Sequence, residues 1–212
     1  YINKGNKIVI ADLNNQPLFD SPQKIDEEIN ANPIIFDFNN DGKYEIAYAS
    51  AKGKLYYYNS ILELENEYPL DLTVDNSFPP VLYENNFLGF DKKEKKLYLA
   101  GIDGRKDYID FEFKSPLLSA PEIYKKYATF YPKSFSGTVY LTDFDFNILK
   151  GWPREGGGIG FGSPVLTDID RGGGVEVVYL SQSGILNVWD KEGERYEGSP
   201  FKLDGVYYTQ PV

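Results

Sequence analysis

Short apolar runs separated by polar turns extend along the whole chain. The runs at 45–50 and 54–59 are rich in aromatic and apolar residues, and a glycine turn joins them. The runs at 175–181 and 185–190 repeat this arrangement. Runs of this length and composition, bounded by Gly, Asn and Asp, are typical of β-strands and tight turns. The pattern therefore predicts an all-β protein of short strands.

A long internal repeat gives these strands an order. Residues 32–59 align without a gap on residues 163–190, at an offset of 131 residues (164 − 33). One third of this offset is about 44 residues, the length of one four-stranded propeller blade. Prolines that open an apolar run mark the same period, with spacings of 47, 41, 43 and 47 residues: Pro33, Pro80, Pro121, Pro164 and Pro211. The sequence therefore predicts a β-propeller with four-stranded blades of about 41–47 residues.

The repeat also predicts the domain organisation. The units lie at 31–76, 77–114, 115–158 and 159–205, with partial units at 1–30 and 206–212. We expect a single β-propeller domain over 1–212, or a fragment of one, with about four to five blades. Partial units at both ends fit either a shared blade that closes the ring or a continuation into further blades. The continuation into a larger propeller is the favoured interpretation.

Composition narrows the chemistry. The chain has no His and no Cys, which removes the usual general base, thiolate chemistry and most transition-metal sites. Its formal net charge of −10 argues against nucleic acid as a partner, because phosphate binding needs clustered Lys and Arg. No apolar run approaches the roughly 20 residues of a membrane span, so no membrane insertion is expected. A bound metal should be a hard cation on oxygen ligands, such as Ca2+.

An Asp-rich loop in the first full unit has the spacing of a calcium site. Ligands are predicted at loop positions one, three, five, seven and nine: Asp37, Asn39, Asp41, the carbonyl of Lys43, and Glu45. Gly42 at position six permits the sharp turn, and alternation places the ligands on one side of the backbone. The alternative is that Asp, Asn and Gly act here only as turn formers. We take Ca2+ as the expected cofactor of this loop.

The same loop recurs in the last full unit in an altered form. Asp168, Asp170 and Glu176 keep three ligand positions, and Gly174 stands at position seven. Gly172 replaces the acidic residue at position five. Calcium binding and a plain turn both remain open for this loop. The matching place in the preceding unit, 125–126, has no such loop, and its two lysines would repel a cation.

These residues resemble the FG-GAP/VCBS-type repeats of integrin-like β-propellers. The shared pattern comprises the proline and Asp-rich loop at 33–45, the Gly-x-apolar-Tyr turn at 53–56 and Gly-Trp-Pro at 151–153. The resemblance covers nearly the whole chain and implies structural calcium in the loop between the first two strands of a blade. It also implies a non-catalytic binding or scaffold module, extracellular, on the cell surface or periplasmic, with a protein or glycan ligand.

Other features leave a carbohydrate function open. Some polysaccharide lyases resemble these calcium-bearing blades, so the alternative is the propeller of a carbohydrate-active enzyme or a polysaccharide-binding protein. An enzyme is not favoured, because Asp-x-Asp pairs are typical of loops and calcium sites. The aromatic residues at 56–58, 152, 189 and 207–208 fit a sugar platform or packing between blades, and packing is favoured.

The Gly-rich stretch 155–162 is interpreted as a connection between blades. A phosphate-binding loop is not favoured there, since no Gly-Lys-Ser/Thr follows it. A purely structural segment of a larger surface protein is the third possibility.

Overall fold

The computed structural model of the 212-residue chain gives the placement of most residues. It describes residues 2–3, 7–11, 14–17, 23–24, 27, 29, 33–50, 52–71, 81–91, 94–113, 115, 117–209 and 211. Of the proline landmarks, Pro80 lies outside these residues. Every regular secondary-structure element assigned within the described residues is a β-strand. A search of the same residues finds no helix that is long and apolar enough to cross a membrane.

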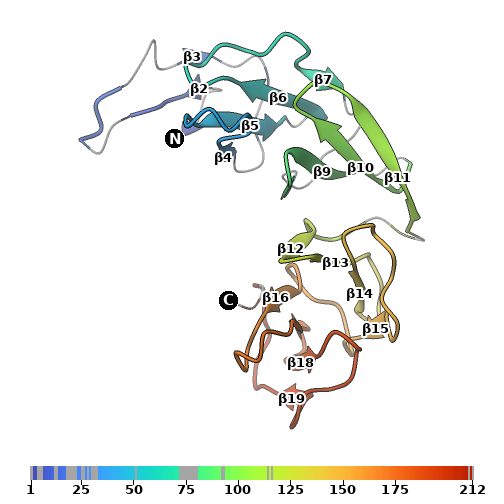
Figure 1. The fold of residues 1–212 in the computed structure, drawn as a ribbon. Helices are drawn as coiled ribbons and strands as arrows, with labels where there is room; N and C mark the ends of the chain where they lie inside the picture. Colours follow the sequence, from blue (N-terminus) through green and yellow to red (C-terminus); the bar gives the residue numbers. More distant parts are fainter. Residues whose placement is uncertain are drawn as a thin grey trace. The chain divides into compact units, whose positions relative to one another are not determined.

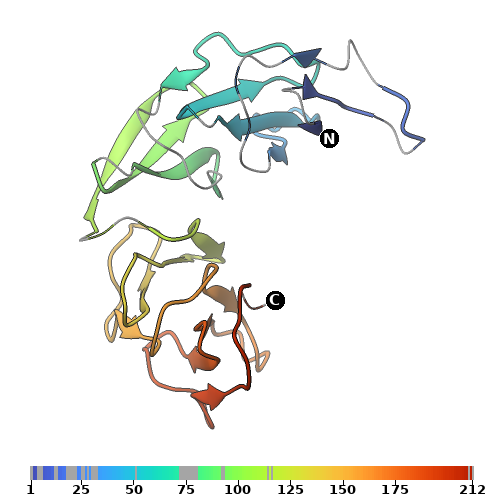
Figure 2. The ribbon, with the colours of Figure 1, turned by 180° about the vertical axis from the view of Figure 1, so that it is seen from behind.

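Among the described residues, four four-stranded antiparallel sheets follow one another, each with its strands in chain order (Figures 1 and 2). The first comprises β4 (Ile34–Phe36), β5 (Glu45–Ala49), β6 (Lys54–Tyr58) and β7 (Leu70–Asp71). The second comprises β8 (Val81–Tyr83), β9 (Asn86–Asp91), β10 (Lys96–Gly101) and β11 (Lys106–Glu112). The third comprises β12 (Glu122–Tyr124), β13 (Tyr127–Phe130), β14 (Thr138–Thr142) and β15 (Arg154–Glu155). The fourth comprises β16 (Val165–Thr167), β17 (Glu176–Leu180), β18 (Ile185–Trp189) and β19 (Phe201–Lys202).

A shorter sheet precedes these four. It has three strands, β1 (Ile2–Asn3), β2 (Lys7–Ile8) and β3 (Gln23–Lys24). The prediction of an all-β chain built from four-stranded repeats is therefore confirmed, and the repeat at 77–114, which has no Asp-rich loop, also forms a four-stranded sheet.

The first hairpin of each sheet differs in a way that positions the candidate site. In sheets β8–β11 and β12–β15 the paired residues Tyr83 with Asn86, and Tyr124 with Tyr127, leave two-residue turns. In sheet β4–β7 residues 37–44 separate the first two strands, and in sheet β16–β19 residues 168–175 do so. The Asp-rich loops therefore both connect the first strand of a sheet to the second.

The chain divides into two compact units, Tyr1–Tyr108 and Ile109–Val212, and the division falls inside β11. We call them unit one and unit two. Unit one contains the three-stranded sheet, sheet β4–β7 and the first three strands of sheet β8–β11. Unit two contains sheets β12–β15 and β16–β19.

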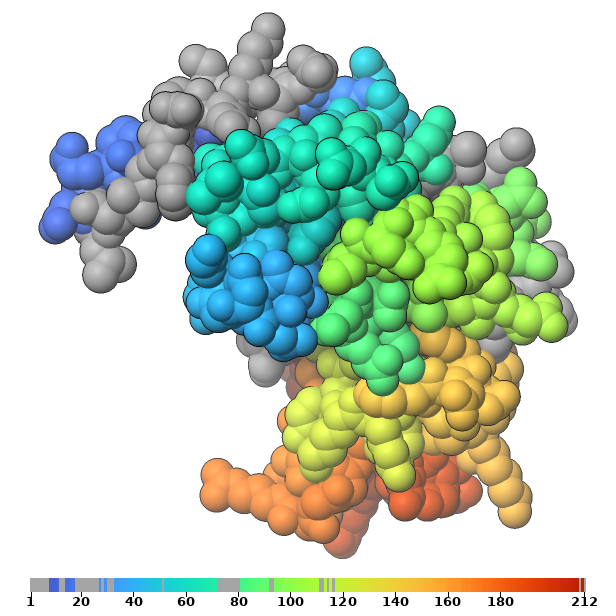
Figure 3. Space-filling model, turned by 45° about the horizontal axis from the view of Figure 1, so that its top comes forward, coloured from blue at the N-terminus to red at the C-terminus, as the bar shows by residue number. Residues whose placement is uncertain are grey.

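The core of unit one explains why its central strands are apolar along their whole length. All five residues of β5 are buried, because both faces of its sheet are covered. On one face Ala47, Leu55 and Tyr57 pack with Phe87 and Tyr98 of the next sheet. On the other face Tyr48, Tyr56 and Tyr58 stack with ring planes 10–15° apart and pack against Ile8. The space-filling view shows sheet β4–β7, coloured blue to teal, beside sheet β8–β11, coloured green (Figure 3).

The core of unit two joins its two sheets in the same way. The rings of Trp152 and Trp189 meet edge to face at 5.8 Å, and the Trp152 indole N–H donates to the Lys191 carbonyl at 2.9 Å. Both tryptophans are buried, as are Tyr56, Tyr57 and Tyr58 in unit one. The preference for packing over a sugar platform is confirmed for these rings. Tyr208 differs, since it is 66% exposed.

Candidate metal centre

The loop between β4 and β5 folds around its own acidic side chains. The Asp37 carboxylate accepts the Asp41 N–H through Oδ1 at 3.0 Å and the Gly42 N–H through Oδ2 at 2.9 Å. Asn39 Oδ1 also accepts the Asp41 N–H at 2.9 Å, and Asp41 Oδ1 accepts the Lys43 N–H at 2.9 Å. Gly42 has a φ of +84°, which favours glycine. The predicted turn and its inward-facing oxygens are therefore formed together.

Glu45 is the buried member of this set. It is 1% exposed, and its Oε2 accepts the Phe38 N–H at 2.9 Å. Burial raises the pKa of the Glu45 carboxyl above its ordinary 4.5, and the nearby Asp41 and Asp37 carboxylates raise it further. A cation beside these groups would oppose both effects, because it favours the charged form of each carboxyl.

The donor set fits a hard divalent cation. Asp37, Asp41 and Glu45 each place one carboxylate oxygen within 4.8 Å of the other two. Carboxylate, amide and backbone carbonyl oxygens are the ligands that calcium takes, and it takes six to eight of them. Asn39 and Lys43 lie in the same loop, where they hydrogen-bond to Asp41. Acidic groups also gather at protein surfaces without a metal, so the cluster alone does not identify an ion.

The loop between β16 and β17 repeats this geometry in unit two. Asp168, Asp170 and Glu176 also bring one oxygen each within 4.8 Å of the others. Glu176 Oε2 accepts the Ile169 N–H at 2.7 Å, as Glu45 does from Phe38. Asp168 Oδ2 accepts the Gly173 N–H at 3.1 Å, as Asp37 does from Gly42. Gly174 follows at position seven and lines a neighbouring pocket.

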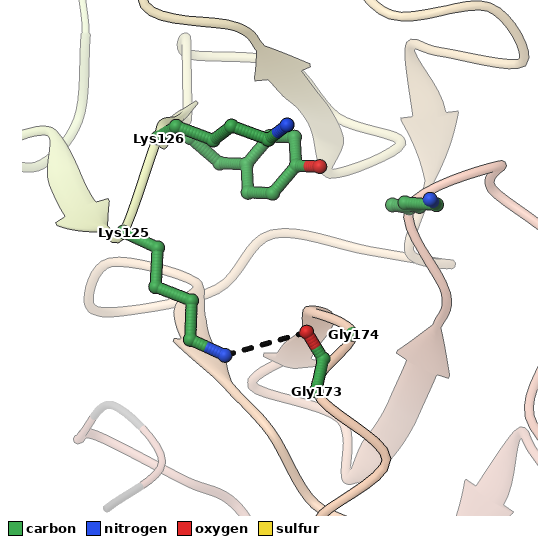
Figure 4. Close-up of a pocket in the computed structure, with 6 residues that line it drawn as sticks. Lys125, Lys126, Gly173 and Gly174 are labelled. Carbon is green, nitrogen blue, oxygen red and sulfur yellow. Dashed lines mark hydrogen bonds between the residues drawn. The ribbon is translucent and has the colours of Figure 1, made fainter.

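A lysine from the preceding sheet reaches this second loop. The Lys125 ammonium, in the turn between β12 and β13, lies 3.5 Å from Asp168 Oδ2 and donates to the Gly173 carbonyl at 3.4 Å (Figure 4). Lys126 and Lys191 line the same pocket, whose volume is about 520 Å³. The pair is half exposed, so its contribution to stability is about 0–1 kcal/mol. Its consequence is electrostatic, because a positive charge already stands beside the acidic loop.

A buried charged cluster in sheet β8–β11 was not found from the sequence. Asp91 is fully buried, and its Oδ2 accepts the Tyr108 hydroxyl at 2.7 Å and lies 3.8 Å from the Lys106 ammonium. Burial lowers the pKa of the Lys106 ammonium, although Asp91 acts in the opposite direction. In the sequence, residues 106–112 alternate between polar and apolar, and Asp91 ends an earlier apolar run. This pattern could not identify a buried charged cluster, because ordinary strands with one exposed face show the same alternation.

Comparisons with known proteins bear on the fold. No protein-family model matches the chain, and no curated protein matches it by sequence. BamB from Moraxella catarrhalis has 12% identity and a TM-score of 0.57, over 95% of this chain and 57% of that one. Virginiamycin B lyase from Staphylococcus aureus has 14% identity and a TM-score of 0.60, over 95% of this chain and 64% of that one. BBS1N, solved in complex with ARL6DN, has 14% identity and a TM-score of 0.57, over 85% of this chain and 56% of that one.

These similarities show a class of fold. The similar structures are β-propellers, and the described residues form successive four-stranded antiparallel sheets, so the chain has a β-propeller-like fold. At this level of identity the likeness shows the fold alone. The chain spans less than two thirds of the length of these three proteins.

Proposed function

We propose that the chain is a non-catalytic binding or scaffold module whose blades are held by calcium in the loop between β4 and β5. The observation that carries the proposal is the convergence of Asp37 and Asp41 on Glu45, a carboxyl that is 1% exposed. Three carboxylates in one loop repel one another unless a cation or protons neutralise them. Ca2+ suits this all-oxygen set, and Asn39 and the Lys43 carbonyl supply two further oxygens of the kind it needs.

A structural role for the ion follows from the hydrogen bonds of the loop. The Asp37, Asp41 and Glu45 carboxylates accept backbone N–H groups of their own loop, so their orientation is tied to the path of the chain. An ion at their centre would link the end of β4 to the start of β5. Calcium sites of extracellular modules bind at about 10⁻⁴–10⁻³ M, a range that the exposed loop would suit. We therefore propose an extracellular, cell-surface or periplasmic location, as for the repeats that the sequence resembles.

The second loop is proposed to depend less on calcium than the first. It has Gly172 where the first loop has Asp41, and the Lys125 ammonium is 3.5 Å from Asp168. Both differences lower the negative charge that a divalent ion would meet. In this proposal the second loop acts mainly as a turn, which the contacts of Lys125 hold to the neighbouring sheet. Its residues at the ligand positions are Asp168, Asp170, Gly174 and Glu176.

A calcium-dependent melt of the full chain tests the proposal. We expect Ca2+ at about one hundred times its Kd to add about 2.7 kcal/mol, or about 5–11 °C in Tm for a chain of this size. Asp41→Ala should abolish this shift, because it removes one carboxylate from the set. Asp145→Ala, which removes an exposed acid from a turn of unit two, is the matched control and should keep the shift. Identical wild-type melts in calcium and in chelator would contradict the metal assignment.

The nature of the partner needs a separate assay. A protein ligand and a glycan ligand both fit the proposed module, and the alternative of a carbohydrate-active enzyme predicts turnover in addition to binding. A reducing-end assay on acidic polysaccharides distinguishes these, since a binding module gives retention without new reducing ends. If the chain shows turnover, and replacing a single Asp or Tyr abolishes it, the chain is an enzyme and not a non-catalytic binding module.

A further inference from the structure

A second pocket of unit two lies between the stretch after β15, in one of its sheets, and β18, the third strand of the other. Its volume is about 510 Å³, within the range of about 300–1,000 Å³ that small-ligand sites occupy. Gly156 and Gly157, directly after β15, line it from one sheet, and Ile185 and Asn187 of β18 line it from the other. Asn187 is 1% exposed and is the buried polar residue of the lining, whereas Glu155 and Arg195 are exposed and form its rim.

The Asn187 amide is only half used within the protein. Its Nδ2 donates to the Gly156 carbonyl at 2.8 Å, which sets the orientation of the amide group. Its Oδ1 is buried and has no hydrogen-bond partner within the described residues. A buried acceptor without a donor costs about 1–3 kcal/mol, and buried polar groups are otherwise nearly always paired. Asn187 lines the pocket, so a ligand group that reaches this oxygen has to donate a hydrogen bond to it.

The rim offers a complementary set of polar groups. Glu155 can accept hydrogen bonds, Arg195 can donate them, and the Ser136 hydroxyl can do both. Neither the Glu155 carboxylate nor the Arg195 guanidinium has an ion-pair partner in the part of the chain that the structure describes. Ile185 adds an apolar wall. The pocket thus combines acceptors, a donor and an aliphatic surface without an excess of either charge.

The wall that carries these groups is held in place by backbone hydrogen bonds. The Gly156 N–H donates to the Gly137 carbonyl at 3.0 Å, and the Gly158 N–H donates to the Ser136 carbonyl at 3.1 Å. Tyr179 packs beneath the same stretch and donates its hydroxyl to the Gly158 carbonyl at 2.6 Å. A site that is formed before its ligand arrives loses less entropy on binding.

We propose that this pocket is a subsite for a neutral sugar residue. A pyranose presents hydroxyls that donate and accept in turn, which matches Asn187, Glu155 and Arg195, and a C–H face that packs on Ile185. A simple anion would be attracted by Arg195 but repelled by Glu155. A simple cation would be attracted by Glu155 but repelled by Arg195. The proposal rests on the binding-module function above and narrows its ligand to a glycan.

The test is a titration of the full isotope-labelled chain with methyl glucoside, methyl galactoside and methyl mannoside, followed by backbone amide NMR. At least one sugar should shift the resonances of Gly156, Gly157 and Asn187 in a saturable way. Arg195→Ala and Glu155→Gln alter exposed side chains and should each weaken that binding about tenfold, as the loss of one charge-assisted hydrogen bond does. Glu197→Gln, an exposed position that does not line the pocket, is the matched control.

Three results would overturn the proposal. In the first, none of the three sugars shifts these resonances. In the second, the shifts are the same in wild type, Arg195→Ala and Glu155→Gln. In the third, sodium glucuronate binds where the neutral sugars do not, and only Arg195→Ala weakens it, which would make the pocket an anion site. The calcium melt depends on Asp41 in unit one, so its result separates failure of the sugar site from failure of the proposed module.

Discussion

The Gly-rich stretch 155–162 provides a sharp test of how unit two is held together. It crosses the ring of Tyr179, which is 1% exposed, and a Cβ atom at Gly156 would lie 2.2 Å from Cδ1 of that ring. The Tyr179 hydroxyl donates to the Gly158 carbonyl at 2.6 Å and lies 2.9 Å from the Tyr131 hydroxyl. Tyr131 in turn accepts the Gly160 N–H at 2.6 Å. The absence of side chains thus lets the backbone approach a buried phenol closely.

The substitution Tyr179→Phe removes one oxygen and keeps the ring. It creates no large cavity, so the cost comes from the Gly158 carbonyl and the Tyr131 hydroxyl, which each lose a partner. The Tyr131 hydroxyl keeps the Gly160 N–H as a partner, so the group left unpaired is the Gly158 carbonyl, at a cost of about 1–3 kcal/mol. At about 2–4 °C per kcal/mol for a chain of this size, we expect Tm to fall by roughly 2–12 °C.

Two measurements on the same variant check this reasoning. Thermal melts give the change in Tm, and hydrogen exchange should show faster exchange of the amides at 156–162 without a change in β5 and β6 of unit one. Tyr208→Phe is the control, because that side chain is 66% exposed and its hydroxyl should contribute little. A Tm for Tyr179→Phe equal to that of Tyr208→Phe, with unchanged exchange at 156–162, would refute the role of the buried hydroxyl.

Two further predictions concern buried charges in unit one. Burial raises the pKa of Glu45, so in chelator its ionisation destabilises the folded state; this penalty is absent below its ordinary pKa of 4.5 and grows as pH rises through the folded value. Glu45→Gln should therefore raise Tm in chelator at neutral pH and lose that advantage in acid. The same substitution should abolish the increase in Tm that calcium gives. A Tm below that of the wild type, in chelator at neutral pH, would contradict the argument. Asp91→Ala should lower stability by roughly 3 kcal/mol in urea unfolding, because it leaves Lys106 without its buried carboxylate. Asp107→Ala on the exposed side of β11 should change little, and equal effects of the two would show that the buried pair is not stabilising.

The strand pattern and the position of the candidate loops were accessible from the sequence because they depend on neighbours along the chain. A glycine turn between two aromatic runs predicted the hairpin of β5 and β6, which the structure confirms with Tyr48 paired to Tyr56. The spacing of Asp37, Asp41 and Glu45 predicted that their oxygens would gather in one loop, and they lie within 4.8 Å of one another. Alternation along a turn is enough to bring such residues together. Occupancy of the loop by calcium stays a prediction.

The packing of one sheet on the next decided what the repeat could not show. Lys125 reaches Asp168 and Gly173 although it lies 48 positions before Gly173 in the sequence. The spacing of residues within one sequence repeat gives no indication of this contact. The Asn187 pocket likewise exists only where β18 faces the stretch after β15. Sequence periodicity specifies each sheet because strand pairing and turns are local. The charges and cavities between sheets depend on side chains brought together by stacking, so only the tertiary structure placed them.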